Sequence, residues 1–249
     1  MTFRVVTLNM EQDHKRWDLR RALLADQLCA LQPDILALNE VCVPLQTARW
    51  LQSVLNERLG TEYALVQQNR TGGLSAIEAE AVLTRFPLRE TANLDFRTRD
   101  MVALVARVVV DAKPVDVYVT HLFMSRGDDS LRLYQVQQLL AWIDTRDDAA
   151  ARIVCGDFNA TLDMPSAALM ATRLSPTQTA PTAFTPLAGE EGEVSHETWA
   201  RMDRCFDYVW IAGALKVRDS GVCFNQPSSA DASLWPSDHA GVWADLALD

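Results

Sequence analysis

The sequence predicts a mixed α/β fold in which two β-sheets share one domain. Three observations lead to this interpretation: a strand–helix–strand–helix order at the start, a strand-rich block in the middle, and a return of strand–helix–strand order before the end. The two α/β stretches flank the strand-rich block, so each half has strands that need the other half to complete a core. We therefore expect one domain over residues 1–249.

The first α/β stretch opens the chain. Residues 3–8 are rich in β-branched side chains, and apolar residues then recur at helical spacing between residues 17 and 31. Pro33 ends that helix, residues 35–38 form a short apolar run of the buried-strand type, and a second helical pattern covers residues 45–59. The predicted order is β-α-β-α.

The middle block predicts strand after strand. Its strand-like segments are residues 63–68, 79–84, 101–110 and 115–120, and glycine and proline punctuate the intervals. Short connections of this kind join antiparallel neighbours, so we expect an antiparallel sheet here.

The last part of the chain returns to helix and strand. Leu133, Val136, Leu140 and Ile143 predict a third helix, and residues 153–155 then form a strand that leads directly into Gly-Asp. Short-helix and loop material follows, and the final strands are predicted at residues 206–211, 217–224 and 240–246.

Composition places the chain among ordinary globular proteins. It is 49% hydrophobic and 22% charged, which excludes disordered and low-complexity classes, and no apolar run approaches the roughly 18 residues of a membrane span. The chain opens on a strand-like segment rather than a signal peptide, so we expect a cytoplasmic protein. Its five cysteines are odd in number and lack zinc-type spacing, which favours reduced thiols.

The charge balance argues against proteins that coat nucleic acid. The formal net charge is −10, and only three of the 23 basic residues are lysines. Such a chain repels polyanions at long range, so duplex nucleic acid is an unlikely partner, although a local arginine patch could still bind a phosphate. A compact phosphate-ester substrate is favoured, and the oligomeric state stays open.

Polar side chains that could bind a metal or a phosphate gather where predicted strands end. Five segments share this feature, and they contain Asn9 with Glu11, Glu40, His121, Asp157 with Asn159, and Asp238 with His239. Carboxylate and amide oxygens suit Mg²⁺ or Mn²⁺, whereas zinc would favour more histidine or cysteine. The sequence therefore predicts a site for a hard divalent cation.

A sixth segment, residues 206–209, places Asp207 inside an otherwise apolar strand. An unpaired charge there would cost several kcal/mol. Asp207 must therefore have a partner.

The six segments together resemble the endonuclease/exonuclease/phosphatase superfamily, which includes deoxyribonuclease I-like nucleases, inositol polyphosphate 5-phosphatases and neutral sphingomyelinases. The resemblance rests on the order N, E, T-H-L, G-D-F-N, D-Y and S-D-H, and it runs from Asn9 to His239. It implies a four-layer α/β sandwich, with two mostly antiparallel β-sheets packed face to face between helices. It also implies a site at one end of the sheets.

The resemblance implies a metal site around Glu40. Glu40 matches the principal metal ligand of the family, and Asn9 and Asp238 match residues that lie near it. Glu11 stands where some members place a second acid. The implied cofactor is Mg²⁺, with Mn²⁺ as the alternative.

The resemblance also implies catalytic roles. Asp157 and Asn159 match positions that orient the attacking water and contact the phosphate, and His121 matches a histidine that stabilises the phosphoryl oxygens. His239, held by Asp207, matches the His–Asp pair of the family. The resemblance does not decide which of Asp157 and His239 is the base, so the acid/base role is assigned to the two residues jointly.

Two positions depart from the family pattern. Asn39 stands before Glu40 where the family usually has glutamine, and Arg204 lies three residues before Asp207 where many members have an arginine two residues before it. The second departure leaves Asp203 as an alternative partner for His239.

The function implied is hydrolysis of a phosphate ester by in-line attack of water. We expect a phosphodiesterase acting on a small or single-stranded substrate; the alternatives are an inositol-type phosphomonoesterase, a DNA repair nuclease and an inactive binding module of the same fold. The complete set of acids and histidines argues against the inactive module. We expect Arg132 and Gln135 to be scaffold, and substrate specificity to lie in loops such as 124–130 and 185–201.

Overall fold

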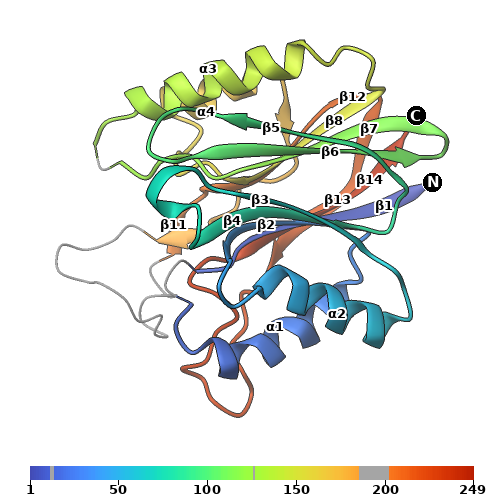
Figure 1. Cartoon of the computed structure of the whole chain (residues 1–249), viewed down its shortest axis with the longest axis vertical. Coiled ribbons are helices and arrows are strands. Elements are labelled where there is room, and N and C mark those ends of the chain that lie inside the picture. Colours follow the sequence, from blue (N-terminus) through green and yellow to red (C-terminus); the bar gives the residue numbers. More distant parts are fainter. Residues whose placement is uncertain (12–13, 126, 185–201) are drawn as a thin grey trace.

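Two six-stranded β-sheets lie face to face, and helices cover the outer face of each (Figure 1). The structure is a computed structural model that describes residues 1–11, 14–125, 127–184 and 202–249. Its layers run helix, sheet, sheet, helix, so the predicted four-layer α/β sandwich is confirmed. Residues 185–201, where the sequence predicts a specificity loop, lie outside the described residues.

The first sheet joins strands from both ends of the chain. Strands β1 and β2 are parallel, and every other pair in this sheet is antiparallel. Helices α1 (Trp17–Leu31) and α2 (Thr47–Leu59) follow these two strands, which confirms the predicted β-α-β-α opening. The spatial order is β13 (Leu215–Cys223), β14 (Gly241–Leu248), β1 (Thr2–Asn9), β2 (Ile35–Cys42), β4 (Glu78–Thr84) and β3 (Ala64–Asn69).

The second sheet repeats this plan. Strands β7 and β8 are parallel and joined through helix α3 (Ser130–Asp144), and the other pairs are antiparallel. Helix α4 (Pro165–Ala171) packs beside α3. The spatial order is β5 (Leu88–Asp95), β6 (Val102–Val110), β7 (Lys113–Thr120), β8 (Ala151–Asp157), β12 (Asp207–Gly213) and β9 (Ser175–Pro176).

Two smaller elements stand beside the sheets. A short 3-10 helix, η1 (Gly72–Leu74), follows β3, and strands β10 (Ala183–Phe184) and β11 (Met202–Arg204) form a two-stranded sheet. Leu74 of η1, Ala183 of β10 and Arg204 of β11 line the same pocket as the predicted site residues.

Apolar side chains fill three layers of core. One cluster lies between the sheets and includes Val5 and Ile35 from the first sheet with Val117 and Ile153 from the second. Two further clusters lie beneath the helices, one under α1 and α2 and one under α3 and α4. Because the central cluster takes residues from both halves of the chain, neither half buries its own apolar face alone.

The strand-rich middle block differs from the prediction in two ways. Its strands are shared between the sheets, with β3 and β4 in the first and β5, β6 and β7 in the second. Strand β5 was not predicted, because it is a mostly exposed edge strand in which only Ala92 and Leu94 alternate toward the core.

Strand β2 is longer than predicted and carries a bulge. The register with β4 shifts between Leu38 and Val41, and Glu40 has a φ of 53°. Asn39 and Glu40 therefore lie inside the strand at an irregularity, where a bulge can redirect a side chain, and not after its end.

The sheets approach each other closely where β8 ends. Gly156 has a φ of 131°, and a Cβ atom at this position would lie 2.0 Å from the Thr120 carbonyl oxygen and 2.9 Å from Asn39 Oδ1. Only glycine allows this approach. It brings the site residues of β2, β7 and β8 together.

In the described parts of the chain, no helix has both the length and the apolar character required to cross a membrane.

Candidate active site

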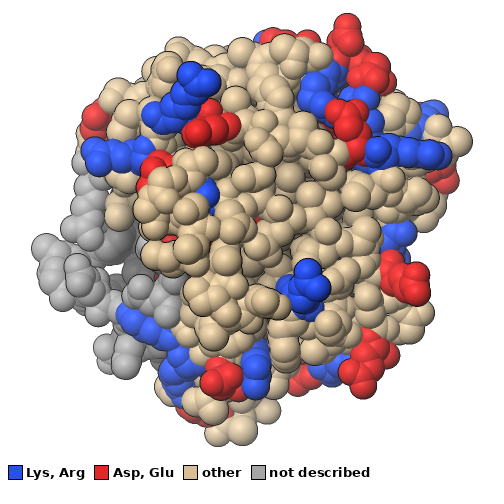
Figure 2. Space-filling view, viewed as in Figure 1, with Lys and Arg blue, Asp and Glu red and all other residues tan. Residues whose placement is uncertain are grey.

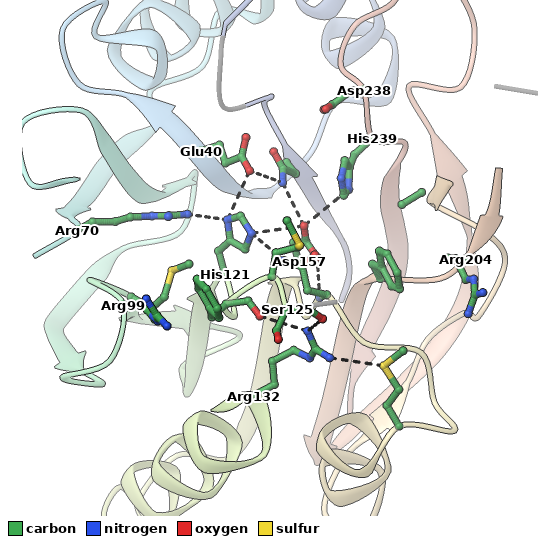
Figure 3. A pocket seen from close by; sticks show the side chains of 18 of the residues that line it. Glu40, Arg70, Arg99, His121, Ser125, Arg132, Asp157, Arg204, Asp238 and His239 are labelled. Carbon is green, nitrogen blue, oxygen red and sulfur yellow. Dashed lines mark hydrogen bonds and ion pairs between the residues drawn. The ribbon is translucent and has the colours of Figure 1, made fainter. Parts of the chain in front are cut away.

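A pocket of 720 Å³ opens at the end of the sandwich where β1, β2, β7 and β8 carry their polar residues. Seven of the nine predicted site residues line it (Figure 3). They are Asn9, Glu40, His121, Asp157, Asn159, Asp238 and His239. Asp207 lies behind His239, and Glu11 is not among the lining residues.

Asn9, Glu40 and Asp238 form what we call the acidic corner. Asn9 Nδ2 donates to Glu40 Oε1 at 3.0 Å and to Asp157 Oδ2 at 3.2 Å, which fixes the orientation of the Glu40 carboxylate. Burial, with the nearby carboxylates of Asp238 and Glu78, raises the pKa of Glu40 well above its ordinary value. The corner therefore brings two carboxylates near each other, and the Asn9 hydrogen bond and the charge of His239 offset their repulsion only in part.

The donor set of the acidic corner fits a hard divalent cation. Carboxylate oxygens are ligands that Mg²⁺ and Mn²⁺ prefer, and a cation would relieve the repulsion by Asp238 that adds to burial in raising the pKa of Glu40. Asn9 Oδ1 accepts the Glu11 backbone N–H at 3.0 Å, so the amide presents its nitrogen, and not its oxygen, to Glu40.

Asp157, Asp207 and His239 form the histidine–aspartate corner. Strands β8 and β12 pair Asp157 directly with Asp207, and His239 Nδ1 lies 2.9 Å from Asp207 Oδ2 and 3.8 Å from Asp157 Oδ2. Burial alone would lower the pKa of His239, but the carboxylates of Asp207 and Asp157 raise it well above its usual value. The ring therefore holds a proton between two carboxylates.

The same charges act on Asp157. Burial and the neighbouring Asp207 carboxylate raise the pKa of Asp157 to about 7. A group with such a pKa can exchange a proton near neutral pH, which is what an acid/base group requires.

The histidine–aspartate corner also has metal-ligand spacing. One ligand atom from each of Asp157, Asp207 and His239 lies within 4.8 Å of the others. Yet His239 Nδ1 already bonds to Asp207, and its positive charge balances the carboxylates, so this corner has less need of a cation than the acidic corner.

His121 follows β7 and has a different environment. Arg70 Nη2 lies 2.6 Å from His121 Nδ1, and the Asn159 amide nitrogen lies 3.0 Å from His121 Nε2. Burial, with the positive charges of Arg70 and His239, lowers the pKa of His121 well below its usual value. His121 is therefore a neutral ring at physiological pH.

Four arginines surround this centre, and none of them was predicted as a site residue. Arg70 and Arg204 lie on opposite sides of it in Figure 3, with Arg99 and Arg132 below. Arg70, Arg99 and Arg132 lie in no recognisable motif, and Arg204 was noted only for its offset from the arginine of the family pattern. Only the fold shows that they share one pocket.

Arg132 lines the pocket, and the scaffold role expected for it stays a prediction that its hydrogen bonds support. It is buried rather than solvated, and its guanidinium donates to the Ser125 carbonyl at 3.0 Å and to Asp129 at 2.7 Å. These bonds hold the loop that precedes α3. Gln135 Oε1 supports the same loop by accepting the Phe123 backbone N–H at 3.0 Å.

Two acids lie outside the pocket. Glu11 Oε2 lies 3.4 Å from Arg20 Nε, and both side chains are buried. Asp203, the alternative partner for His239, has a side chain that is 57% exposed and lies 3.6 Å from Arg204. The structure thus places Asp207, and not Asp203, against His239.

Comparisons with known proteins agree with this architecture. Residues 6–239 match the Endonuclease/Exonuclease/phosphatase family. Nocturnin from Homo sapiens is 25% identical over 257 residues, which cover 94% of this chain and 59% of that protein, and nocturnin from Xenopus laevis is 24% identical over 261 residues, with coverage of 94% and 66%. The chain thus spans about three fifths of human nocturnin.

Solved structures share the fold. The human nocturnin catalytic domain with bound sulfate has a TM-score of 0.74 at 24% identity, covering 100% of this chain and 95% of that one. D. rerio TDP2 complexed with single-strand DNA product has a TM-score of 0.74 at 16% identity and 99% coverage of both chains. A Bacteroides vulgatus endonuclease/exonuclease/phosphatase has a TM-score of 0.77 at 17% identity and 100% coverage of both.

Proposed function

The chain belongs to the endonuclease/exonuclease/phosphatase family, a family of hydrolases that act on phosphoester bonds, and we propose that it is a Mg²⁺-dependent phosphodiesterase acting on a small or single-stranded substrate. One observation carries the proposal: an acidic corner that fits a hard cation and a histidine–aspartate corner that holds a proton face the same pocket. A bound cation and a proton-transfer group are the two parts that metal-assisted hydrolysis at phosphorus uses.

The cation would be held by Glu40 and Asp238, with Asn9 beside them. When bound, Mg²⁺ or Mn²⁺ supplies a positive charge that stabilises negative charge as it develops on the phosphoryl group. Asn9 also donates to both Glu40 and Asp157, so it keeps the two carboxylates in a fixed relation.

The protein's own side chains would complete the reaction. Asn159 and His121 lie together and would donate hydrogen bonds to the phosphoryl oxygens, which stabilises the transition state. Asp157, with a pKa of about 7, and His239, held by Asp207, would receive and return the proton of the attacking water. We assign this acid/base role to the two residues jointly.

The pocket favours a compact substrate. Its walls carry apolar side chains, and Arg99 lies over the Phe123 ring at 5.0 Å without an ion pair to any carboxylate in the described ranges. This combination suits an ester that has an anionic group beside a flat or apolar group. The apolar lining residues are Leu74, Met101, Phe123, Met124, Met164, Ala183 and Phe206.

The surface charge argues against duplex nucleic acid. On the face shown in Figure 2, the basic side chains that are drawn are scattered and mixed with acidic ones rather than gathered in a stripe. Together with the net charge of −10, this predicts weak binding of duplex DNA at physiological salt. The likeness to TDP2 with its single-strand DNA product supports a single-stranded nucleotide as one candidate substrate.

Assay of an aryl phosphodiester tests the proposal. Bis(4-nitrophenyl) phosphate should be hydrolysed with Mg²⁺ or Mn²⁺, more slowly with Zn²⁺, and not in excess chelator. Glu40→Gln should abolish most turnover without unfolding the protein, whereas Glu57→Gln, on the exposed face of α2, should leave it unchanged. Undiminished turnover in chelator, or faster hydrolysis of 4-nitrophenyl phosphate than of the diester, would count against a metal-dependent phosphodiesterase.

Variants at Arg99 test whether the pocket binds a short single-stranded substrate. Arg99→Ala should raise KM for a short single-stranded oligonucleotide with little change in kcat, because it removes an anion contact at the pocket wall. Arg97→Ala, in the same exposed loop but not lining the pocket, is the matched control. Tight binding of duplex DNA with a steep salt dependence would favour the repair-nuclease alternative instead.

A further inference from the structure

A buried charged cluster stands directly behind His121. Arg70 follows β3, is 4% exposed, and directs its guanidinium away from solvent toward the histidine ring (Figure 3). Its Nη2 lies 2.9 Å from Glu78 Oε2, and its Nε lies 3.5 Å from Glu80 Oε1. Both glutamates come from β4 and have no solvent exposure.

Glu80 connects this cluster to the rest of the site. It accepts a hydrogen bond from Asn39 Nδ2, which also donates to the Thr120 carbonyl at 3.0 Å. Asn39 Oδ1 in turn accepts the Asp157 backbone N–H at 2.9 Å. The asparagine that replaces the usual glutamine of the family therefore joins β2 and β4 to β7 and β8.

The contact between Arg70 and His121 fixes where the ring carries its proton. A guanidinium has hydrogens to donate and no lone pair to accept with, so at 2.6 Å His121 Nδ1 must be the acceptor. A neutral ring then carries its one proton on Nε2.

That proton has no acceptor within the described part of the site. The Asn159 amide nitrogen, 3.0 Å from His121 Nε2, can only donate: one of its two hydrogens goes to the Leu122 carbonyl at 2.9 Å, and Nε2 could accept the other only in the opposite tautomer. The shorter contact of the charged Arg70 with Nδ1, at 2.6 Å, opposes that tautomer and leaves the second Asn159 hydrogen for the pocket. Asp157 Oδ2, at 3.6 Å, lies beyond hydrogen-bonding distance. Since His121 lines the pocket, an oxygen atom of a ligand can supply the missing acceptor.

We propose that Arg70, braced by Glu78 and Glu80, is a positioning residue that holds His121 in the tautomer with the proton on Nε2, so that this nitrogen donates to a phosphoryl oxygen of the substrate. The phosphoryl part of this inference rests on the proposed function; the tautomer does not. Arg70 acts through His121 and does not itself contact the reacting atoms.

Nitrogen NMR of the histidine rings tests the tautomer directly. The full-length protein is labelled with ¹⁵N-histidine in excess Mg²⁺, and His121→Gln identifies the His121 signals. The wild-type protein should show a protonated Nε2 and an unprotonated Nδ1 in His121. Arg70→Lys, which keeps a charged donor, should retain this pattern, and Arg70→Met should produce a mixture of tautomers or a ring protonated on Nδ1.

Turnover of the aryl phosphodiester separates positioning from substrate binding. Arg70→Met should lower kcat about 10-fold with KM changed less than 2-fold, since one neutral hydrogen bond in the transition state is at stake. An unchanged His121 tautomer in Arg70→Met would overturn the proposal, as would a rise in KM with kcat unchanged. Arg85→Met, which disturbs a part-buried ion pair with Asp34 away from the pocket, should change neither readout.

A charge-balanced variant controls for misfolding of Arg70→Met, and the NMR result can be interpreted even without phosphodiesterase activity. Arg70→Met leaves two carboxylates buried without their cation, so the triple variant Arg70→Met/Glu78→Gln/Glu80→Gln removes the charges together and should show the same change of tautomer. If the wild-type protein hydrolyses no phosphodiester, the proposed function fails while the NMR result still supports or overturns the role of Arg70.

Discussion

His121 and His239 line the same pocket, yet their surroundings give them opposite protonation states. His239 lies against Asp207 and Asp157, which raise its pKa well above the usual value. His121 lies against Arg70 and is buried, and its pKa falls well below the usual value. The neighbouring charges, and not the residue type, decide that one ring carries a proton and the other donates a hydrogen bond as a neutral group.

The difference also separates the two halves of the reaction. His121 Nδ1 lies 3.7 Å from Glu40 Oε1, so the neutral ring belongs to the corner that fits a cation. His239 supplies its own positive charge to the corner formed with Asp157 and Asp207. If His121 were also protonated, its positive charge would repel a cation bound at the acidic corner. This repulsion gives a physical reason why His121 is neutral and only His239 is charged.

Removal of the charge beside His239 should have the largest effect. Asp207→Asn keeps the shape of the side chain but deletes the carboxylate that raises the pKa of His239, so kcat should fall by at least ~10²-fold with little change in KM. Steady-state kinetics on the aryl phosphodiester provide the measurement. Asp203→Asn is the control and should leave kcat nearly unchanged. A large loss of kcat in Asp203→Asn with a small loss in Asp207→Asn would make Asp203 the partner of His239.

A change at His121 should have a smaller effect. His121→Gln retains an N–H donor and removes no positive charge, because the ring is neutral, so a loss of about 10-fold in kcat is expected. His121→Ala removes the donor and should lose more, toward ~10²-fold. If His121→Gln instead changed the pH dependence of kcat as strongly as Asp207→Asn, His121 would be a proton carrier and the contrast between the histidines would fail.

The smallest expected effect is on stability: the titration of Asp157 should make the free energy of unfolding depend on pH. The pKa of Asp157, raised to about 7, means that the folded protein binds this proton more tightly than the unfolded chain does. The stabilisation is fully present below the ordinary pKa near 4 and is lost as the pH rises through about 7. Cation-free wild-type protein should therefore lose stability between pH 4 and pH 7.

Asp157→Asn removes this titration and should melt about 2–6 °C above the wild-type protein at pH 7. Thermal unfolding at several pH values in excess chelator gives the measurement. Asp147→Asn, an exposed change beyond the end of α3, should follow the wild-type curve. Parallel curves for wild type and Asp157→Asn would show that Asp157 titrates normally.

Much of the fold could be predicted because its signals are local. Apolar periodicity identified α1, α2 and α3 and most of the central strands, whose residues are buried on both faces. Strand β5 could not be found, since an edge strand with exposed residues carries little pattern. The division of the middle block between two sheets depends on long-range pairing that no local pattern encodes.

The candidate site likewise contains residues that the sequence predicts and residues that only the fold shows. Asn9, Glu40 and Asp157 occur in recognisable short motifs, and the structure brings them to one pocket. Arg70 has no motif, and its contact with His121 spans 51 residues of sequence. Only the meeting of β3, β4 and β7 shows that an ordinary arginine faces a histidine.

Calorimetric titration of Mg²⁺ into two variants tests the separation of cation and proton most directly. Glu40→Gln should bind Mg²⁺ at least ~10-fold more weakly than the wild-type protein, because it removes a charged oxygen ligand from the acidic corner. Asp207→Asn should bind Mg²⁺ with wild-type affinity although its turnover is lost. The opposite result, with Mg²⁺ binding lost in Asp207→Asn and retained in Glu40→Gln, would place the cation among Asp157, Asp207 and His239 and contradict the account.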